Sequence, residues 1–201
     1  AEADLGFDAD GLNNLEPAAD KANQDKADDG LLLSTVTVNH CQTGTMQVVV
    51  SIDTTAAALL PNGTGYLNLW VDSNRDGDWA DRFECPQTAT GAPAVALEHI
   101  VIDMPINAAA LGAGVHTINV STTGPVFWPA DLAGKATWLR ATLSERPANK
   151  PFTSYGDGRG YDDPFRLGET EDYLLPGRVN PQGSGDADPV VTKRGEIWPD
   201  F

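Results

Sequence analysis

The chain has 201 residues, with 29 Asp and Glu against 13 Lys and Arg, so that its formal net charge at pH 7 is −16. Such an acidic protein repels nucleic acid and anionic membrane surfaces, which excludes nucleic-acid binding and favours divalent cations as partners. The sequence contains no apolar run approaching the roughly 20 residues that a membrane-spanning helix requires, and we expect no membrane insertion.

Composition divides the chain into three regions. Residues 1–30 form an acidic N-terminal arm rich in Asp, Asn and Ala, residues 31–176 carry the signals of a folded domain, and residues 177–201 form a tail with little apolar periodicity. The chain opens at "AEADLG" without an initiator Met, as a processed export product does, and we expect a secreted or cell-surface protein.

From residue 31 onward, short β-branched and aromatic runs recur between clusters of Gly, Pro, Asn and Asp, which is typical of an all-β protein. In the clearest run, "TMQVVVSID", Met46, Val48 and Val50 alternate onto one face. The expected fold is an antiparallel, jelly-roll-like β-sandwich with extended arms. Two Ala-rich connectors, 54–60 and 106–114, are predicted to form short helical turns. The seven predicted strands are 31–39, 45–53, 65–72, 97–104, 114–121, 136–144 and 171–175.

An acidic segment, "WVDSNRDGDWADRFE" at residues 70–84, predicts a calcium site. Calcium takes six to eight oxygen ligands at flexible geometry, and a turn with oxygen side chains at alternate positions and a Gly at the bend can wrap around it. Magnesium prefers a tighter octahedron, and zinc prefers His or Cys. The predicted ligands are Asp72, Asn74, Asp76, Asp78, Asp81 and Glu84.

The start of this segment matches an EF-hand loop, but its end departs from one, because Phe83 stands where the Glu of an EF-hand belongs and Glu84 follows. A simpler alternative is an acidic surface turn in which Asp and Asn side chains cap their own backbone. If alternate positions face the metal, Arg75 and Arg82 should point to solvent.

The two cysteines, Cys41 and Cys85, follow a predicted strand and the acidic segment. A disulfide between them would fasten the end of the acidic segment to a neighbouring strand and would fit an oxidising compartment. Two free buried thiols are the alternative.

Three motifs give the sequence a family resemblance. "LWVDSNRDGDWADRFE", "WLRATLSE" and "GETEDYLL" occur in the order found in the GEVED domain, an extracellular bacterial module, and "ADDGL" at 27–31 is similar to the entry that often precedes it. The resemblance covers residues 28–175, with Thr170 in place of the usual Val. It implies a secreted or surface-displayed β-sandwich with Asp72, Asn74, Asp76, Asp78 and Glu84 as metal ligands.

A second group of charged residues is a candidate metal or charge cluster. The last motif supplies three carboxylates on one segment, and Arg140 in "WLRATLSE" is a natural charge partner for one of them. Two further acids in the N-terminal arm could close a second site or merely solvate the arm. The candidates are Asp28, Asp29, Glu169, Glu171, Asp172 and Arg140.

Nothing in the sequence supports catalysis, since it has no G-x-S-x-G elbow, P-loop or H-E-x-x-H motif. The leading hypothesis is a non-enzymatic, calcium-stabilised structural or adhesive module that forms an extracellular polymer through its arms or binds another surface protein or glycan. The alternative is a carbohydrate-binding module of a larger secreted enzyme, with Trp70, Trp128 or Trp138 as the sugar platform. A hydrolase using the acids and their metal is a third, more remote reading.

Overall fold

The structure is a computed structural model that describes residues 30–75, 79–85, 94–129, 134–148 and 167–175; for residues 55, 56, 169, 172 and 174 only the backbone is described. The helical elements are α1 (Thr54–Leu59), the 3-10 turn η2 (Pro61–Gly63) and α2 (Ala108–Leu111). The strands are β1 (Leu31–Thr37), β2 (Gln42–Ile52), β3 (Thr64–Val71), β4 (Arg82–Cys85), β5 (Ala94–Leu97), β6 (His99–Asn107), β7 (Gly114–Val126), β8 (Thr137–Ser144) and β9 (Gly168–Leu175).

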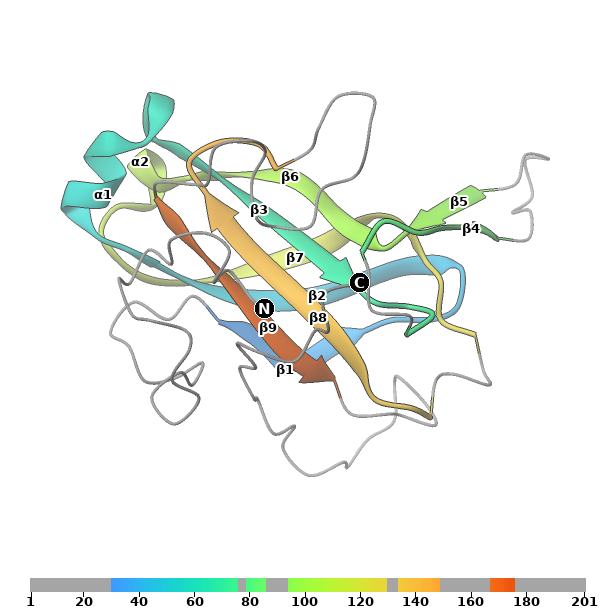
Figure 1. The fold of residues 1–201 in the computed structure, drawn as a ribbon. Coiled ribbons are helices and arrows are strands. Elements are labelled where there is room, and N and C mark those ends of the chain that lie inside the picture. Colours follow the sequence, from blue (N-terminus) through green and yellow to red (C-terminus); the bar gives the residue numbers. More distant parts are fainter. Residues whose placement is uncertain (1–29, 76–78, 86–93, 130–133, 149–166, 176–201) are drawn as a thin grey trace, which may run out of the picture.

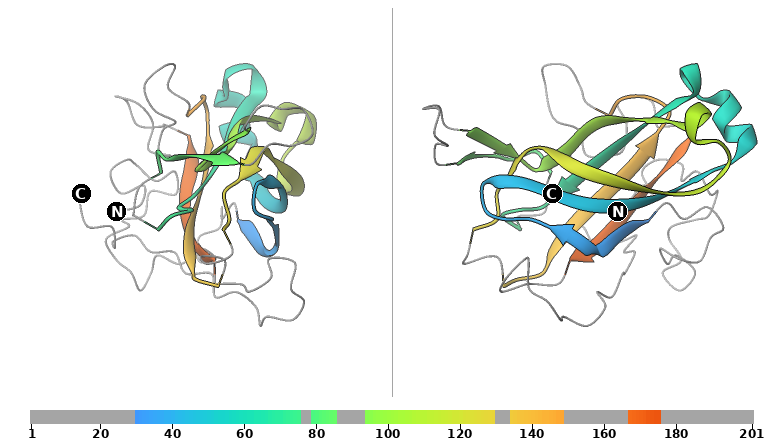
Figure 2. Two further views of the ribbon diagram at one scale, coloured as in Figure 1. Left: turned by 90° about the vertical axis from the view of Figure 1, so that its right-hand side faces the viewer. Right: turned by 180° about the vertical axis from the view of Figure 1, so that it is seen from behind.

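Seven of these strands form two antiparallel sheets that face each other, as Figure 1 and the edge view in Figure 2 show. Sheet A has the order β1-β2-β7 and sheet B the order β6-β3-β8-β9, while β4 and β5 form a separate hairpin. If β4 and β5 are left out, the strands in chain order are β1, β2, β3, β6, β7, β8 and β9. The first, second and fifth of these form sheet A, and the third, fourth, sixth and seventh form sheet B. This connectivity is that of an immunoglobulin-like sandwich whose fourth strand has joined the second sheet.

Period-two alternation builds the core between the sheets. Val48 and Val50 of β2 and Leu67 and Leu69 of β3 are buried in one continuous cluster, to which β8 adds Leu139. The intervening residues of each strand face away from this cluster. The predicted all-β, antiparallel sandwich is therefore confirmed, but its strand order is immunoglobulin-like and not the jelly-roll-like order expected from the sequence.

The structure also refines the predicted elements. Both Ala-rich connectors contain a helix, α1 and α2, and these lie together at one end of the sandwich (Figure 1). The hairpin β4–β5 was not predicted, and the run expected as one strand at 97–104 is interrupted at Glu98, between β5 and β6. Among the described residues, no helix combines the length and apolar character needed to cross a bilayer.

Candidate metal centre

The β3–β4 loop (residues 72–81) leaves sheet B at the end of its second strand. Its entrance is fixed by main-chain hydrogen bonds, because Val71 N donates to Glu98 O at 2.9 Å and Asp72 N donates to Trp138 O at 3.0 Å. The Thr137 hydroxyl donates to the carbonyl of Asp72. Asp72 is consequently buried, with 2% of its surface exposed, and it lies at the base of the loop.

Glu98, which the sequence did not single out, joins the two ends of this loop. Its Oε1 accepts a hydrogen bond from Ser73 N at 2.8 Å, and its Oε2 accepts one from Asp81 N at 3.3 Å. The Glu98 main-chain N–H in turn donates to Asp81 O at 3.1 Å. Glu98 has no exposed surface, so its carboxylate lies beneath the loop.

The surroundings of Glu98 disfavour its charged form. The pKa of Glu98 is raised to about 8, chiefly by burial; the two backbone hydrogen bonds oppose this shift, and the nearby carboxylates of Asp72 and Asp81 add to it. Three carboxylates from two separate segments are thus close enough to interact electrostatically. Two of the predicted ligands, Asp72 and Asp81, therefore each interact with Glu98, which was not among the predicted ligands.

The remaining predicted ligands divide into three groups. Asn74 is half-buried and its Nδ2 donates to Asp81 Oδ2 at 2.5 Å, which places its amide beside the acids. Glu84 is exposed on β4, opposite Val95 of β5. Asp76 and Asp78 lie outside the described residues. Within the described part of the chain, no three His, Cys, Asp or Glu side chains lie so that they could hold a metal ion.

Arg75 differs from its prediction. It does not extend freely into solvent, because its guanidinium donates to the carbonyls of Ala136 at 2.9 Å, Lys135 at 2.8 Å and Ser73 at 3.1 Å. Its backbone adopts a left-handed conformation with φ of 66°. Arg75 therefore ties the loop to the segment preceding β8, whereas Arg82 is exposed as predicted.

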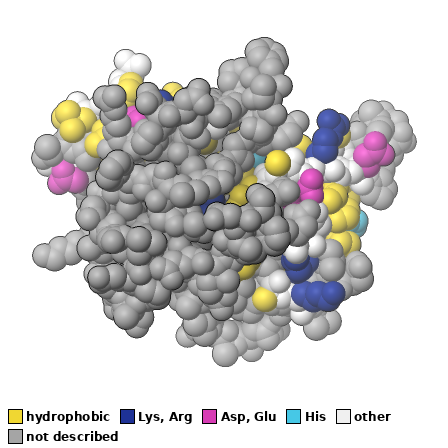
Figure 3. Space-filling model, viewed as in Figure 1, with side chains coloured by type: hydrophobic (Ala, Val, Ile, Leu, Met, Phe, Trp, Pro, Cys, Tyr) yellow, Lys and Arg dark blue, Asp and Glu magenta, His cyan; other side chains and the backbone are white. Residues whose placement is uncertain are grey.

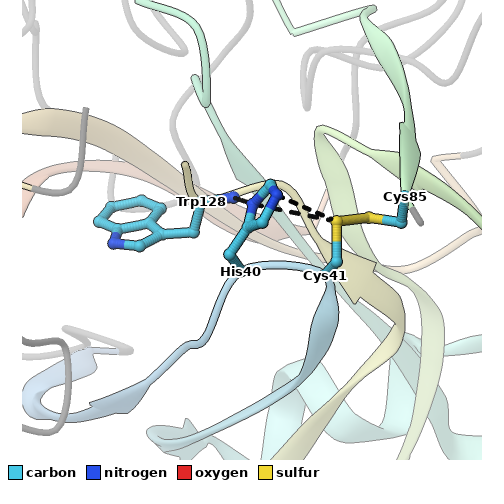
Figure 4. Close-up of a disulfide and its surroundings, with 4 residues drawn as sticks. All are labelled: His40, Cys41, Cys85 and Trp128. Atoms are coloured by element: carbon cyan, nitrogen blue, oxygen red, sulfur yellow. Dashed lines mark hydrogen bonds between the residues drawn. A yellow bond between two sulfur atoms is a disulfide. The ribbon is translucent and has the colours of Figure 1, made fainter. Parts of the chain in front are cut away.

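The predicted disulfide between Cys41 and Cys85 is confirmed, with a Cα–Cα separation of 5.4 Å. It joins the end of β4 to the residue just before β2. Figure 4 shows His40 beside it, with Nε2 3.5 Å from the Cys41 sulfur, while Trp128 N donates to His40 Nδ1 at 3.1 Å. The exit of the acidic segment is thereby fastened covalently to sheet A.

The face of sheet B that points away from the core carries a second cluster of aromatic and polar side chains. Trp70 is fully buried and stacks on His99 with ring centroids 4.2 Å apart, and His99 Nε2 is 2.7 Å from Asn68 Oδ1. Arg140, 2% exposed, lies over the ring of Trp79 at 5.2 Å. Trp70 therefore serves in packing and has no exposed ring face.

The last motif, "GETEDYLL", forms strand β9 and is explained largely by packing. Gly168 has a φ of 108°, and a Cβ there would overlap the main chain of Leu143, so only glycine fits. The hydroxyls of Thr170 and Thr142 are 2.9 Å apart, and the hydroxyl of Tyr173 accepts a hydrogen bond from Leu31 N at 3.2 Å. The motif thus fastens the edge of sheet B to its neighbour and to sheet A.

The second predicted cluster is only partly within the described structure. In the register of β8 and β9, Arg140 is opposite Asp172, and Glu171 is opposite Ala141 and buried. For Glu169 and Asp172 the structure describes the backbone alone, and Asp28 and Asp29 lie outside the described residues. The register makes Asp172 the residue of the motif that lies opposite Arg140.

These features define a disulfide-bridged, antiparallel β-sandwich whose acidic loop is anchored on a buried glutamate. The space-filling view in Figure 3 shows the side chains of the described residues by type on one face of the molecule. The chain belongs to the GEVED domain family, whose model matches residues 66–176, more than half of its length. The match runs from β3 to the end of β9 and therefore includes the β3–β4 loop and the disulfide's second cysteine. No curated protein and no solved structure matches the chain.

Proposed function

We propose that this chain is an extracellular, non-enzymatic module in which calcium stabilises the β3–β4 loop, and that it serves as a structural or adhesive surface component. The observation that carries the proposal is the position of Glu98 beneath the loop, beside Asp72 and Asp81. Three neighbouring carboxylates repel one another when ionised, and a bound cation removes this cost.

The chemistry of the donor set fits a hard cation. The carboxylates of Asp72, Asp81 and Glu98 offer oxygen only, as does the side-chain carbonyl of Asn74, and neither His nor Cys belongs to the group. Oxygen donors on an irregular loop suit calcium, which tolerates variable geometry, better than magnesium or zinc. Asp76 and Asp78, from the same loop, would complete such a site.

A stabilising role follows from the way the loop is held. Glu98 bonds to both ends of the loop, Arg75 fixes it to the segment before β8, and the disulfide fixes the strand that follows. An ion bound there would lock the hairpin β4–β5 to both sheets. The disulfide also fits an oxidising, extracellular location.

Calcium dependence of stability tests the proposal. A ligand that binds only the folded state stabilises it by RT ln(1 + [L]/Kd), which is about 2.7 kcal/mol when free calcium is a hundredfold above Kd. The melting temperature should fall in chelator and recover with calcium, and magnesium should restore less. Isothermal titration calorimetry on the chelator-treated protein measures the affinity directly, and an absence of both binding heat and stabilisation would contradict the proposal.

The terminal arms are the proposed route to an extracellular polymer, because the tail contains the β-prone run "PVVT" that could add to the sheet edge of a neighbouring molecule. Light scattering on a chain lacking residues 177–201 tests this part, and unchanged assembly would contradict the proposed role of the tail.

For the carbohydrate-binding alternative, Trp70 and Trp128 are buried, so that Trp138, which is half-buried, is the platform that remains within the described residues. A glycan array tests it.

A further inference from the structure

Strand β7 lies at one edge of sheet A, and its first part is open to solvent. Its partner is β2 on one side, and among the described residues no strand pairs with its other side; the view from behind in Figure 2 shows the two strands together. The side chains of Val115, Thr117, Asn119 and Ser121 are all exposed, and 71% of Val115 is accessible. We call residues 114–121 the β7 edge. An edge strand presents unpaired N–H and C=O groups to whatever approaches it.

Other edges of the two sheets are protected. In β6, Asp103 has a φ of 48° and Pro105 lacks an N–H, and the pairing of this strand with β3 shifts register twice. The pairing of β1 with β2 shifts between Leu32 and Thr37. Strand β9 carries three acidic residues in its sequence. Bulges, prolines and charges are the devices by which proteins prevent pairing at sheet edges.

The β7 edge has none of these devices. Its sequence, "GVHTINVS", contains no proline and no Lys, Arg, Asp or Glu, and it is rich in the β-branched residues that favour strands. Its register with β2 is unbroken from Ile52 opposite Gly114 to Thr45 opposite Ser121. It is therefore a regular strand whose one ionisable side chain is that of His116, on the surface of a chain with a net charge of −16 when His is neutral.

We propose that the β7 edge pairs antiparallel with the β7 edge of a second copy, so that two sheets A join into one continuous sheet across a two-fold axis. Two copies of so acidic a chain repel each other over most of their surface, and an uncharged strand lets them approach without placing like charges opposite each other. Self-pairing about a two-fold axis is closed and gives a dimer rather than an open filament. This proposal goes beyond the calcium module and does not require the ion.

Substitutions at Thr117, which is exposed on the β7 edge, test the proposal in the full chain by size-exclusion chromatography with light scattering. The wild type should have twice the 21.3 kDa mass of one chain. Both Thr117→Glu and Thr117→Lys should be monomers, because either charge is brought near its own copy across the axis. The matched control is Thr45→Glu, which adds the same charge at an exposed position of β2, an inner strand of the same sheet, and should leave the dimer intact. Circular dichroism should show every variant folded.

Several results would overturn the proposal. One is a monomeric wild type, in calcium and in chelator alike, and another is a dimer that survives both substitutions at Thr117. Loss of the dimer in Thr117→Glu but not in Thr117→Lys would assign the effect to overall charge, and loss on deletion of residues 177–201 would assign it to the tail. A Thr117→Cys or Asn119→Cys variant gives a positive test, since oxidation should link two copies through the new cysteine, whereas Thr45→Cys should not. Because calcium binding is measured separately by calorimetry, failure of either proposal is distinguishable from failure of the other.

Discussion

Replacing Glu98 with Gln tests the electrostatics of the β3–β4 loop. The pKa of Glu98 is about 8 in the folded chain and 4.5 in the reference state, so between these values the ion-free folded state holds a proton that the unfolded state has released. The free energy of unfolding of the ion-free protein should therefore fall as pH rises from about 4.5 to about 8. Burial is the main cause, and the repulsion from Asp72 and Asp81 adds to it.

The size of this effect follows from the shift. Each unit of pKa corresponds to about 1.4 kcal/mol, so the whole interval is worth on the order of 5 kcal/mol. The amide introduced by Glu98→Gln cannot ionise and should remove this dependence. The variant can keep the acceptor for Ser73 N, but its amide N–H₂ would face the N–H of Asp81, which costs about 1–3 kcal/mol at every pH. Glu98→Gln should thus have a lower free energy of unfolding than wild type at low pH, and this free energy should hardly change as the pH rises.

Urea unfolding followed by fluorescence, at several pH values between about 5 and 8 in chelator, measures both quantities. The matched control is Glu84→Gln, because Glu84 is exposed on β4 and its substitution should leave the pH dependence unchanged. Calcium should flatten the wild-type curve, since a cation holds Glu98 ionised in the folded state, and it should stabilise Glu98→Gln less than Glu84→Gln. Equal pH slopes for wild type and Glu98→Gln in chelator would refute the reasoning.

Two further predictions concern stability. Replacing Cys41 and Cys85 by Ser removes a disulfide between residues separated by 44 positions, which should lower the free energy of unfolding by about 4 kcal/mol in the chain-entropy account. Urea unfolding with and without reductant measures this loss. An unchanged free energy of unfolding would show that the disulfide hardly restricts the unfolded chain. Gly168→Ala should prevent normal folding, because residue 168 has a positive φ and its new Cβ would overlap the main chain of Leu143. Gly134→Ala is the control and should fold, because the added Cβ meets no other atom there. Circular dichroism and the melting temperature compare the two variants.

The sequence predicted the sandwich because alternation is a local signal. Met46, Val48 and Val50 show the buried face of β2 directly, and strong periodicity of this kind marked the longer strands. The hairpin β4–β5 escaped prediction because each strand has only four residues, too few for alternation to stand out. The disulfide was predictable because the chain has two cysteines, so that a single pairing was available.

The residues of the proposed metal centre could be predicted only in part, because the loop is one continuous segment whereas Glu98, which lies beneath it, comes from another. Asp72 and Asp81 belong to one segment, whereas Glu98 reaches Ser73 from 25 residues along the chain, and the pairing of β4 with β5 brings it there. The run "AVALEHIVI" at residues 94–102 contains one acid among apolar residues, and this is the signal that marks Glu98. A carboxylate in such a run either faces solvent or is buried with partners, and periodicity alone does not distinguish the two.

The proposed site gives Glu98 the part that the sequence analysis assigned to Glu84. Reading outward from Asp72 along an EF-hand spacing leads to Glu84 as the acid that closes the site, because in a helix–loop–helix the chain itself supplies every ligand. Here the loop joins two strands, and β4 carries Glu84 to an exposed position while Cys85 turns into the protein to form the disulfide. Because Glu84 is exposed on β4, the proposed site takes its closing acid from the junction of β5 and β6 instead. Glu98 is that acid, and a smaller loss of calcium affinity in Glu98→Gln than in Glu84→Gln would contradict this account.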